Sequence, residues 1–192
     1  MSPKSQEFQK LSSFQLSAGF RGRSAIIVQL WWIVQATLFA YSPQFMYGWR
    51  RWLLKLFGAS VGKSALVRPT VIVTYPWKLS IGDSAWIGDG VVLYSLGEIE
   101  IGINAVVSQR SYLCAADHDY TQKDFPIRAR KITIGPEAWV AADVFIAPGV
   151  TIGRGAVIGA RSSVFKDMPA GMVCFGYPCS VVKKRFMAGQ RA

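Results

Sequence analysis

One histidine, His118, is the only imidazole in this chain of 192 residues, and it lies in the stretch Ala116-Asp117-His118-Asp119-Tyr120. Proton transfer by a well-placed imidazole is typically worth ~10²–10⁴-fold in rate, so histidine is a natural general base for attack by a hydroxyl group. Asp117 and Asp119 flank it, and either carboxylate could hold the ring in one tautomer. The pattern indicates acid–base chemistry with His118 as its central residue.

The elements that position His118 are predicted from a repeat. Aliphatic residues recur every six positions, usually followed by Gly or another small residue, and the longest run has the anchors Ile134, Val140, Ile146, Ile152, Ile158 and Val164. The fourth residue after each anchor from Ile134 to Ile158 is small or β-branched. A period of six fits neither a helix nor an alternating strand, but it fits a short strand plus a turn that repeats around a prism. Three such units form one coil of a triangular parallel β-helix, in which the anchors stack into a narrow apolar core.

The repeat changes register between Leu93 and Ile101 and again between Leu113 and Ile134. Each change implies that residues are expelled from the prism. The second one expels a loop over residues 114–131 that contains His118, and long loops on repeat scaffolds often carry function. The sequence therefore predicts a mainly β domain over residues 59–182. A polar tail (1–24) and a helical region (25–58) precede it, and a basic tail (183–192) follows.

Two helices are predicted before the repeats. The first, residues 25–41, is apolar all round, and at ~1.5 Å per residue its 17 residues fall short of the ~30 Å of a bilayer core. The second covers residues 47–57, with Trp49, Trp52, Leu53, Leu56 and Phe57 on one face and Arg50, Arg51 and Lys55 on the other. That pattern is typical of a helix at a membrane interface. The alternative is a cap on the open end of the β-helix, because solenoids need caps, and both interpretations stay open.

The composition of the chain limits the kinds of molecule that it can bind. Lys and Arg number 22 against 11 Asp and Glu, and a net charge of +11 favours nucleic acid, anionic lipid or a phosphorylated small molecule. The basic residues gather around the N-terminal helix and the tail instead of alternating with stacking aromatics, so we expect no nucleic-acid partner. The three cysteines (Cys114, Cys174 and Cys179) fit neither a zinc knuckle nor a redox pair, which predicts reduced thiols, no metal and a cytoplasmic location.

These features together resemble a known family. The hexapeptide runs and the loop around His118 are followed by Lys166-Asp167-Met168-Pro169, by Gly176-Tyr177-Pro178-Cys179 and by Lys183-Lys184-Arg185. Over about residues 46–185 the chain resembles the left-handed β-helix acetyltransferases, above all those of colanic acid and exopolysaccharide biosynthesis, which are related to galactoside and maltose O-acetyltransferases. The resemblance implies a left-handed parallel β-helix that works as a homotrimer with sites between subunits. It also implies that acetyl passes directly from acetyl-CoA to a sugar hydroxyl, with His118 as the base.

The resemblance also implies residues that bind coenzyme A. Ala142 and Ala160 match positions whose backbone contacts the pantetheine arm. Arg161, Lys166 and Lys183 are candidates to neutralise the phosphates, for which point charges suffice.

The residues expected to bind the sugar acceptor differ more from the family pattern than those expected to bind coenzyme A. Trp139 matches a tryptophan that lines the acceptor pocket, whereas an asparagine used by the galactoside enzymes has no counterpart, and Asp89 and Tyr94 are our candidates to replace it. Tyr177 and Phe165 also stand where the family has other residues. An acceptor on a membrane lipid would suit the apolar and basic N-terminal helices, which would hold the enzyme peripherally at the inner membrane.

Three other protein classes share part of this pattern. One is an acetyltransferase for a small molecule, such as serine, a drug or a free sugar. A γ-type carbonic anhydrase shares the prism but needs three histidines at each zinc, which one histidine per chain cannot supply. A non-catalytic scaffold or polyanion-binding solenoid would also explain the charge.

Overall fold

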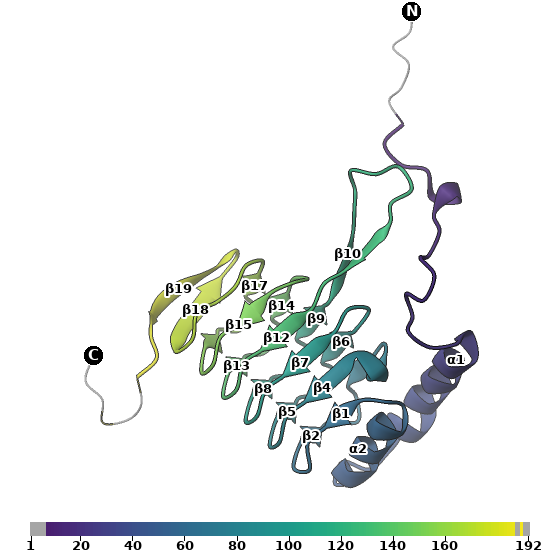
Figure 1. The fold of residues 1–192 in the computed structure, drawn as a ribbon. Helices are drawn as coiled ribbons and strands as arrows, with labels where there is room; N and C mark the ends of the chain where they lie inside the picture. The colour runs from purple at the N-terminus through teal and green to yellow at the C-terminus, as the bar shows by residue number, and fades with distance from the viewer. Residues whose placement is uncertain (1–6, 187–188, 190–192) are drawn as a thin grey trace, which may run out of the picture.

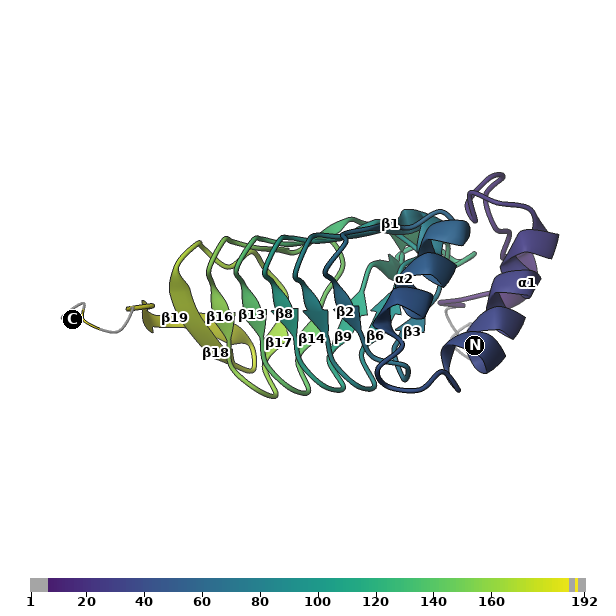
Figure 2. The ribbon, with the colours of Figure 1, turned by 90° about the horizontal axis from the view of Figure 1, so that it is seen from below.

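The computed structural model describes residues 7–186 and 189, so the end of the predicted basic tail lies outside the described residues. The chain winds into a triangular parallel β-helix, with helices at one end and a hairpin projecting from one edge (Figures 1 and 2). The predicted parallel β-helix is confirmed. Left-handed winding is what the family resemblance predicts for it.

Each coil contributes one short strand to each of three sheets. Sheet A contains β1 (Ser60–Val61), β4 (Leu79–Ile81), β7 (Ile99–Ile101), β12 (Ile132–Ile134) and β15 (Thr151–Ile152). Sheet B contains β2 (Leu66–Val67), β5 (Trp86–Ile87), β8 (Val106–Val107), β13 (Trp139–Val140), β16 (Val157–Ile158), β18 (Met172–Gly176) and the antiparallel β19 (Cys179–Lys184). Sheet C contains β3 (Ile72–Val73), β6 (Val92–Tyr94), β9 (Tyr112–Cys114), β14 (Phe145–Ile146) and β17 (Ser163–Val164). Lys183 and Lys184, which the sequence boundary placed in a tail, therefore belong to a strand.

The six-residue period is explained by burial. Every predicted anchor from Ile134 to Val164 is at most 2% exposed, and so is the residue four positions later, such as Ala138 or Val144. Anchors of successive coils lie in register, as in the pair Ile134 and Ile152 of sheet A. The core is therefore a column of aliphatic side chains along the axis of the prism, and each coil buries its anchors against its neighbours.

The outward-facing residues distinguish the three sheets. Sheet A presents polar residues: Ser60, Ser80, Glu100, Thr133 and Thr151. Sheet B presents mostly apolar ones: Leu66, Trp86, Val106, Trp139, Val157 and Val173. Sheet C does the same with Ile72, Val92, Tyr112 and Phe145, and ends with Ser163. The polar outer face of sheet A is thus suited to contact with solvent, whereas the apolar outer faces of sheets B and C are suited to contact with other molecules.

Insertions in the repeat occur at one edge of the prism, where the chain passes from sheet C to sheet A. Both predicted register changes lie there, and so does a third that the sequence analysis missed, the turn η3 (Pro76–Lys78). The predicted loop 114–131 is largely an antiparallel hairpin of β10 (Ala116–His118) and β11 (Ile127–Ala129). At its base, Tyr94 and Ile127 pack on a small cluster around Tyr75 and Leu96 that is separate from the main core.

The N-terminal helices cover the first coil (Figure 2). They are α1 (Ala25–Val34), its wider continuation η2 (Gln35–Phe39) and α2 (Tyr47–Leu56), preceded by the single turn η1 (Leu11–Ser13). Trp31 and Phe39 of the first helix and Leu53 and Leu54 of the second are buried in the main core. The predicted cap is therefore present. In the part of the chain that the structure describes, no helix combines the length and apolar character needed to cross a bilayer.

The second helix buries one residue of its basic face. Arg50, which the sequence places opposite the apolar face, is completely buried, whereas Trp52 and Leu56 of the apolar face are exposed. The open edge of the first coil explains this, because β1, β2 and β3 are the end strands of their sheets and have no preceding coil to pair with. Carbonyls of the first coil are left without strand partners, and side chains of the cap satisfy them. Arg50 Nε donates to Val67 O at 2.6 Å, and Arg51 and Trp31 donate to Ala65 O and Val73 O.

Candidate active site

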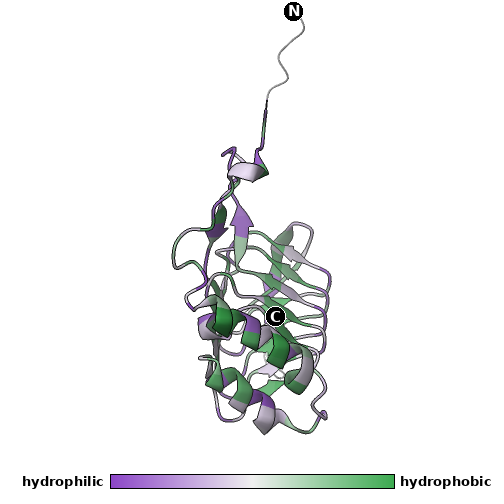
Figure 3. Ribbon diagram, turned by 90° about the vertical axis from the view of Figure 1, so that its right-hand side faces the viewer, coloured by the Kyte–Doolittle hydropathy of each residue, from purple (hydrophilic) through white to green (hydrophobic). Residues whose placement is uncertain are grey.

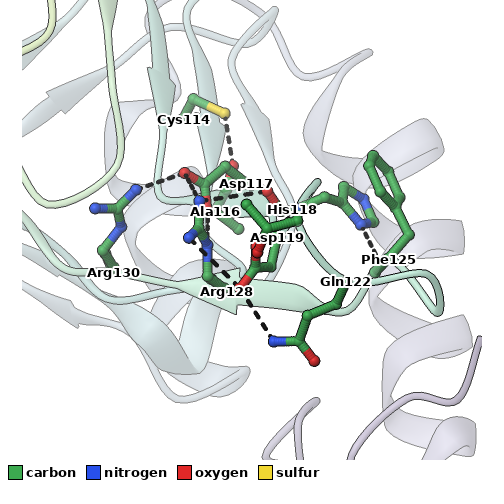
Figure 4. Close-up of polar contacts among 10 residues, drawn as sticks. Cys114, Ala116, Asp117, His118, Asp119, Gln122, Phe125, Arg128 and Arg130 are labelled. Carbon is green, nitrogen blue, oxygen red and sulfur yellow. Dashed lines mark hydrogen bonds and ion pairs between the residues drawn. The ribbon is translucent and has the colours of Figure 1, made fainter. Parts of the chain in front are cut away.

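His118 ends strand β10 on the projecting hairpin. Its Nδ1 lies 2.7 Å from the carbonyl oxygen of Phe125, on the far side of the hairpin tip (Figure 4). A carbonyl oxygen can only accept, so Nδ1 carries a proton, and in the neutral imidazole the lone pair lies on Nε2, which has no hydrogen-bond partner among the described residues. The Phe125 ring also stacks on the imidazole, with ring centroids 4.2 Å apart and planes inclined by 12°. The tip thus fixes both the tautomer and the plane of the imidazole, as a general base requires.

Neither neighbouring carboxylate takes part in this arrangement. Asp117 accepts hydrogen bonds from Arg128 and Arg130 of the opposite side of the hairpin, and these outweigh the effect of burial and lower its pKa. Asp119 accepts from Thr121 and Gln122, which lowers the pKa of its carboxyl. The expectation that Asp117 or Asp119 orients the imidazole is therefore not met in this chain. Both stabilise the hairpin, and the Phe125 carbonyl holds the ring.

Cys114 lies at the base of the hairpin but is not poised for nucleophilic attack. Its Sγ donates to the carbonyl of Ala116 at 3.1 Å, and burial raises the pKa of the thiol (Figure 4). Thiolate is the nucleophilic form of cysteine, so this environment disfavours a covalent acyl-cysteine. Within the described residues, no group of three His, Cys, Asp or Glu side chains could hold a metal ion.

The N-terminal segment runs along the hairpin. Lys10 N–H donates to Lys123 O at 2.7 Å, and the ring of Phe14 lies 6.3 Å from that of His118. Lower down, Lys78 and Trp77 of η3 donate to the carbonyls of Phe20 and Arg21. A segment that was predicted only as a polar tail therefore supplies an aromatic neighbour to the imidazole.

A groove of about 350 Å³ crosses the outer face of sheet B near the helical cap. Tyr47 of α2, Trp86 and Asp89 lie along it, together with Arg68 and Gln109. Arg68 donates to Asp89 at 2.7 Å and to the Tyr47 hydroxyl at 3.2 Å, and this latter bond lowers the pKa of Tyr47. An exposed indole beside fixed polar groups can stack on an apolar ring face and bind hydroxyl groups at its rim.

Comparisons with known proteins identify the family. The family model for the bacterial transferase hexapeptide (six repeats) matches residues 131–166. The Escherichia coli protein named "Putative colanic acid biosynthesis acetyltransferase WcaF" is 59% identical, over 92% of this chain and 97% of its own length. Galactoside O-acetyltransferase of the same bacterium is 33% identical, over 70% of this chain and 68% of its own. The chain belongs to the hexapeptide-repeat acetyltransferases. A structure of galactoside acetyltransferase in complex with coenzyme A has a TM-score of 0.78 at 28% identity, covering 88% of this chain and 84% of that one.

In this acetyltransferase, most of the predicted site residues lie at two edges of the prism. One edge joins sheet B to sheet C, and the other joins sheet C to sheet A. Asp89, Ala142, Ala160 and Arg161 all lie in turns from sheet B to sheet C, and Arg161 N–H donates to Ala142 O of the coil before it. Trp139 faces outward from the adjoining sheet B, and its Nε1 donates to the Ser108 hydroxyl at 3.0 Å.

The remaining predicted residues lie elsewhere. Tyr94, Lys166 and the hairpin with His118 are at the edge from sheet C to sheet A, and Lys183 is on β19 at the end of sheet B. The two sets stand at opposite edges of sheet C, so one chain does not bring His118 to the turns that contain Ala142 and Ala160.

A series of aromatic rings runs along sheet C from coil to coil. Tyr94, Tyr112, Phe145, Phe165 and Tyr177 form a series in which neighbouring ring centroids are 6.0–6.2 Å apart. Burial raises the pKa of Tyr94 and Tyr112. Phe165 and Tyr177, the two departures from the family pattern, are the last rings of this series and extend its aromatic surface.

The sequence analysis missed Phe125, Phe14, Tyr47 and Arg68. Phe125 lies within the predicted loop, but nothing in the order of residues shows that its carbonyl reaches back seven positions to His118. Its φ of 50°, uncommon for an aromatic residue, exists only in the folded tip. The pairing of Arg68 with Asp89 could have been anticipated, because 21 positions correspond closely to one coil.

Proposed function

We propose that this acetyltransferase moves an acetyl group from acetyl-CoA to a sugar hydroxyl of an exopolysaccharide precursor, with His118 as general base. The observation that carries the proposal is the hydrogen bond from His118 Nδ1 to the Phe125 carbonyl, which leaves Nε2 free to accept a proton. Homology to the E. coli protein named for colanic acid biosynthesis supports this acceptor class, and the galactoside enzyme in complex with coenzyme A supports the donor.

The transfer needs no covalent enzyme intermediate. Nε2 of His118 takes the proton of the acceptor hydroxyl as its oxygen attacks the thioester carbon. The carbon–sulfur bond then breaks, and the leaving thiolate receives that proton from the imidazolium. The products are an O-acetyl sugar and free coenzyme A thiol, and the half-buried Cys114 stays outside the reaction.

The acceptor and donor are assigned to separate surfaces. The sugar occupies the groove on sheet B, with Trp86 as a stacking platform, Asp89 as a hydroxyl acceptor and Trp139 beside them. Coenzyme A extends along the turns that contain Ala142 and Ala160, with Arg161, Lys166 and Lys183 as candidates for its phosphates. Tyr94 lines the approach from the hairpin.

A homotrimer completes the site. Sheets B and C both present apolar surfaces, whereas sheet A presents a polar one, so sheet B of one protomer can pack on sheet C of the next around a three-fold axis. This arrangement brings the hairpin of one protomer toward the sheet B groove of its neighbour. It thereby joins residues that one chain keeps at opposite edges.

Release of coenzyme A thiol from acetyl-CoA tests the activity, with mono- and oligosaccharides as acceptors. We expect His118→Ala to lower acceptor-dependent release by at least ~100-fold. Gln122→Ala is the matched control, because Gln122 lies at the same hairpin tip and its amide bonds only to Asp119 among the described side chains. Equal release by wild type and His118→Ala would refute the assignment of His118 as general base. A preference for serine or a drug over every saccharide would show that the acceptor is a small molecule and not a sugar of an exopolysaccharide precursor.

Mixed trimers test the shared site. His118→Ala and Asp89→Ala protomers are each expected to be inactive alone. If His118 and Asp89 meet across an interface, random mixing restores about a quarter of the sites. No recovery, with subunit exchange shown by mass, would place both residues in one protomer.

A further inference from the structure

The outer surface of the helical cap is apolar although the helices are anchored by their inner faces. On α1, Val28 and Trp31 are buried, while Ile26, Leu30 and Ile33 on the opposite side are 78%, 46% and 62% exposed. These three residues are spaced by four and three positions, so they form one stripe along the helix. Neither the coils nor the core uses this stripe.

The second helix extends the same surface. Trp52 and Leu56 of α2 are 51% and 62% exposed. A shallow apolar depression lies between the helices, lined by Ile27 and Leu30 of α1 and by Leu56 of α2. Seen from the capped end, both helices present hydrophobic segments to the viewer (Figure 3). We call this the cap face, made up of Ile26, Ile27, Leu30, Ile33, Trp52 and Leu56.

The chain segment that contains both cap helices carries charge of one sign. Residues 8–82 contain nine Lys and Arg and no Asp or Glu. Arg21 and Arg23 precede α1, and Lys55 stands in the last turn of α2 beside Leu56; all three are exposed. A flat apolar surface with a cationic rim complements the headgroup region of an anionic bilayer, where apolar side chains enter the acyl boundary and cations bind the phosphates. Nucleic acid would be bound by the charges but not by the isoleucine stripe.

We propose that the cap face binds the surface of an anionic phospholipid bilayer, with α1 and α2 lying in the interface. The geometry favours three such contacts at once. In a trimer whose three-fold axis is parallel to the prisms, rotation keeps all three caps at the same end, so they face one plane and bind cooperatively.

This placement also identifies the kind of acceptor, a conclusion that rests on the proposed function. Tyr47 of α2 lines the sheet B groove, so the groove begins directly behind the cap. With the cap on the bilayer, the groove opens beside the headgroups. A saccharide attached to a membrane lipid would reach it there, while the lipid stays in the bilayer.

Sedimentation with vesicles tests the cap face without acetyl-CoA or acceptor, so its outcome is independent of catalysis. The probes are vesicles of phosphatidylcholine alone and of phosphatidylcholine with about 30% phosphatidylglycerol, which gives the surface a negative potential. We expect binding to the anionic vesicles that weakens with added salt, and little binding to the neutral ones. No binding to anionic vesicles would overturn the proposal.

Matched variants locate the contact. Ile26→Gln with Ile33→Gln should lower anionic-vesicle binding about tenfold, because two apolar side chains no longer enter the bilayer. Ile103→Gln removes an isoleucine that is 52% exposed in a turn of the β-helix and should change nothing. Lys55→Gln should lower binding about fivefold. Lys184→Gln, at the other end of the prism, serves as its control.

Two further results would refute the cap face as a lipid surface. One is an equal loss of binding in the Ile103→Gln control. The other is a fall in molecular mass of the Ile26→Gln/Ile33→Gln protein without vesicles, measured by light scattering, which would mean that a second copy covers the face. Thiol release with a soluble saccharide should be unchanged in that variant, whereas release with a lipid-linked saccharide in vesicles should fall in parallel with binding.

Discussion

Arg50 allows a direct test of whether hydrogen bonds from buried side chains attach the helical cap to the first coil. It is completely buried, lies 4.9 Å from the Tyr47 ring and has no carboxylate partner among its hydrogen bonds. Its guanidinium donates to Val67 O, to the Ser42 hydroxyl and to the carbonyls of Pro43 and Gln44, at 2.6–2.9 Å. Burial lowers the pKa of Arg50 but leaves it a cation, because an arginine side chain is not deprotonated in proteins.

The cost of Arg50→Met follows from these four acceptors. Val67 O and the Ser42 hydroxyl are buried, and each loses its donor at a cost of about 1–3 kcal/mol. Pro43 and Gln44 are exposed residues whose carbonyls can bind water instead. Methionine also removes the penalty of burying a cation, which offsets part of the loss. We therefore expect a destabilisation of about 3 kcal/mol, or a fall in Tm of about 6–12 °C for a chain of this length.

Arg51→Met is the matched control. Arg51 neighbours Arg50 in the same helix and donates one hydrogen bond, to Ala65 O at 2.9 Å, from a partly exposed position. Its loss should cost at most about 1 kcal/mol. Thermal unfolding of both variants, followed by circular dichroism at equal protomer concentration, separates the two. If Arg50→Met lowers Tm no more than Arg51→Met does, the cap is not held by donors to the carbonyls of the first coil.

Other predictions concern the hairpin. Asp117→Asn removes the carboxylate that pairs with Arg128 and Arg130, but this carboxylate is not bonded to the imidazole. We therefore expect kcat to fall less than about tenfold. A loss near ~10⁴-fold, as for the aspartate of a catalytic triad, would show that Asp117 orients His118. Because the folded pKa of Asp117 is lowered, its stabilising effect is full above the unfolded value of ~3.9 and is lost as pH falls through the folded pKa. Protection of the β10 amides, measured as the ratio of the intrinsic to the observed exchange rate, should therefore be high at pH 5 and fall below about pH 4. Gly97→Ala places a Cβ 2.6 Å from the Ala115 carbonyl at the hairpin base, so we expect a loss of about 2–4 kcal/mol in thermal unfolding; an unchanged Tm would contradict that close approach. Cys114→Ala should retain thiol release within about twofold, and its abolition would reopen covalent transfer.

The sequence by itself determined the prism and its core. The sequence has an aliphatic anchor every six residues and a small residue four positions after it. Both residues can face the core at the same place in every coil only if the chain winds into a prism. The expelled loop with His118 followed from the same periodicity, since residues that break the period cannot be accommodated in the coils. These inferences depend on local spacing, which the order of residues states directly.

Only the tertiary structure decided how the special positions are used. The sequence placed Arg50 opposite the apolar face of its helix, but the open carbonyls of the first coil require buried donors, and helix periodicity does not encode that requirement. The flanking aspartates were natural partners for His118, yet Asp117 is drawn to Arg128 across the hairpin while Phe125 supplies the carbonyl. Both outcomes depend on which backbone groups remain without a partner after the coils have formed, and that is a property of the folded chain.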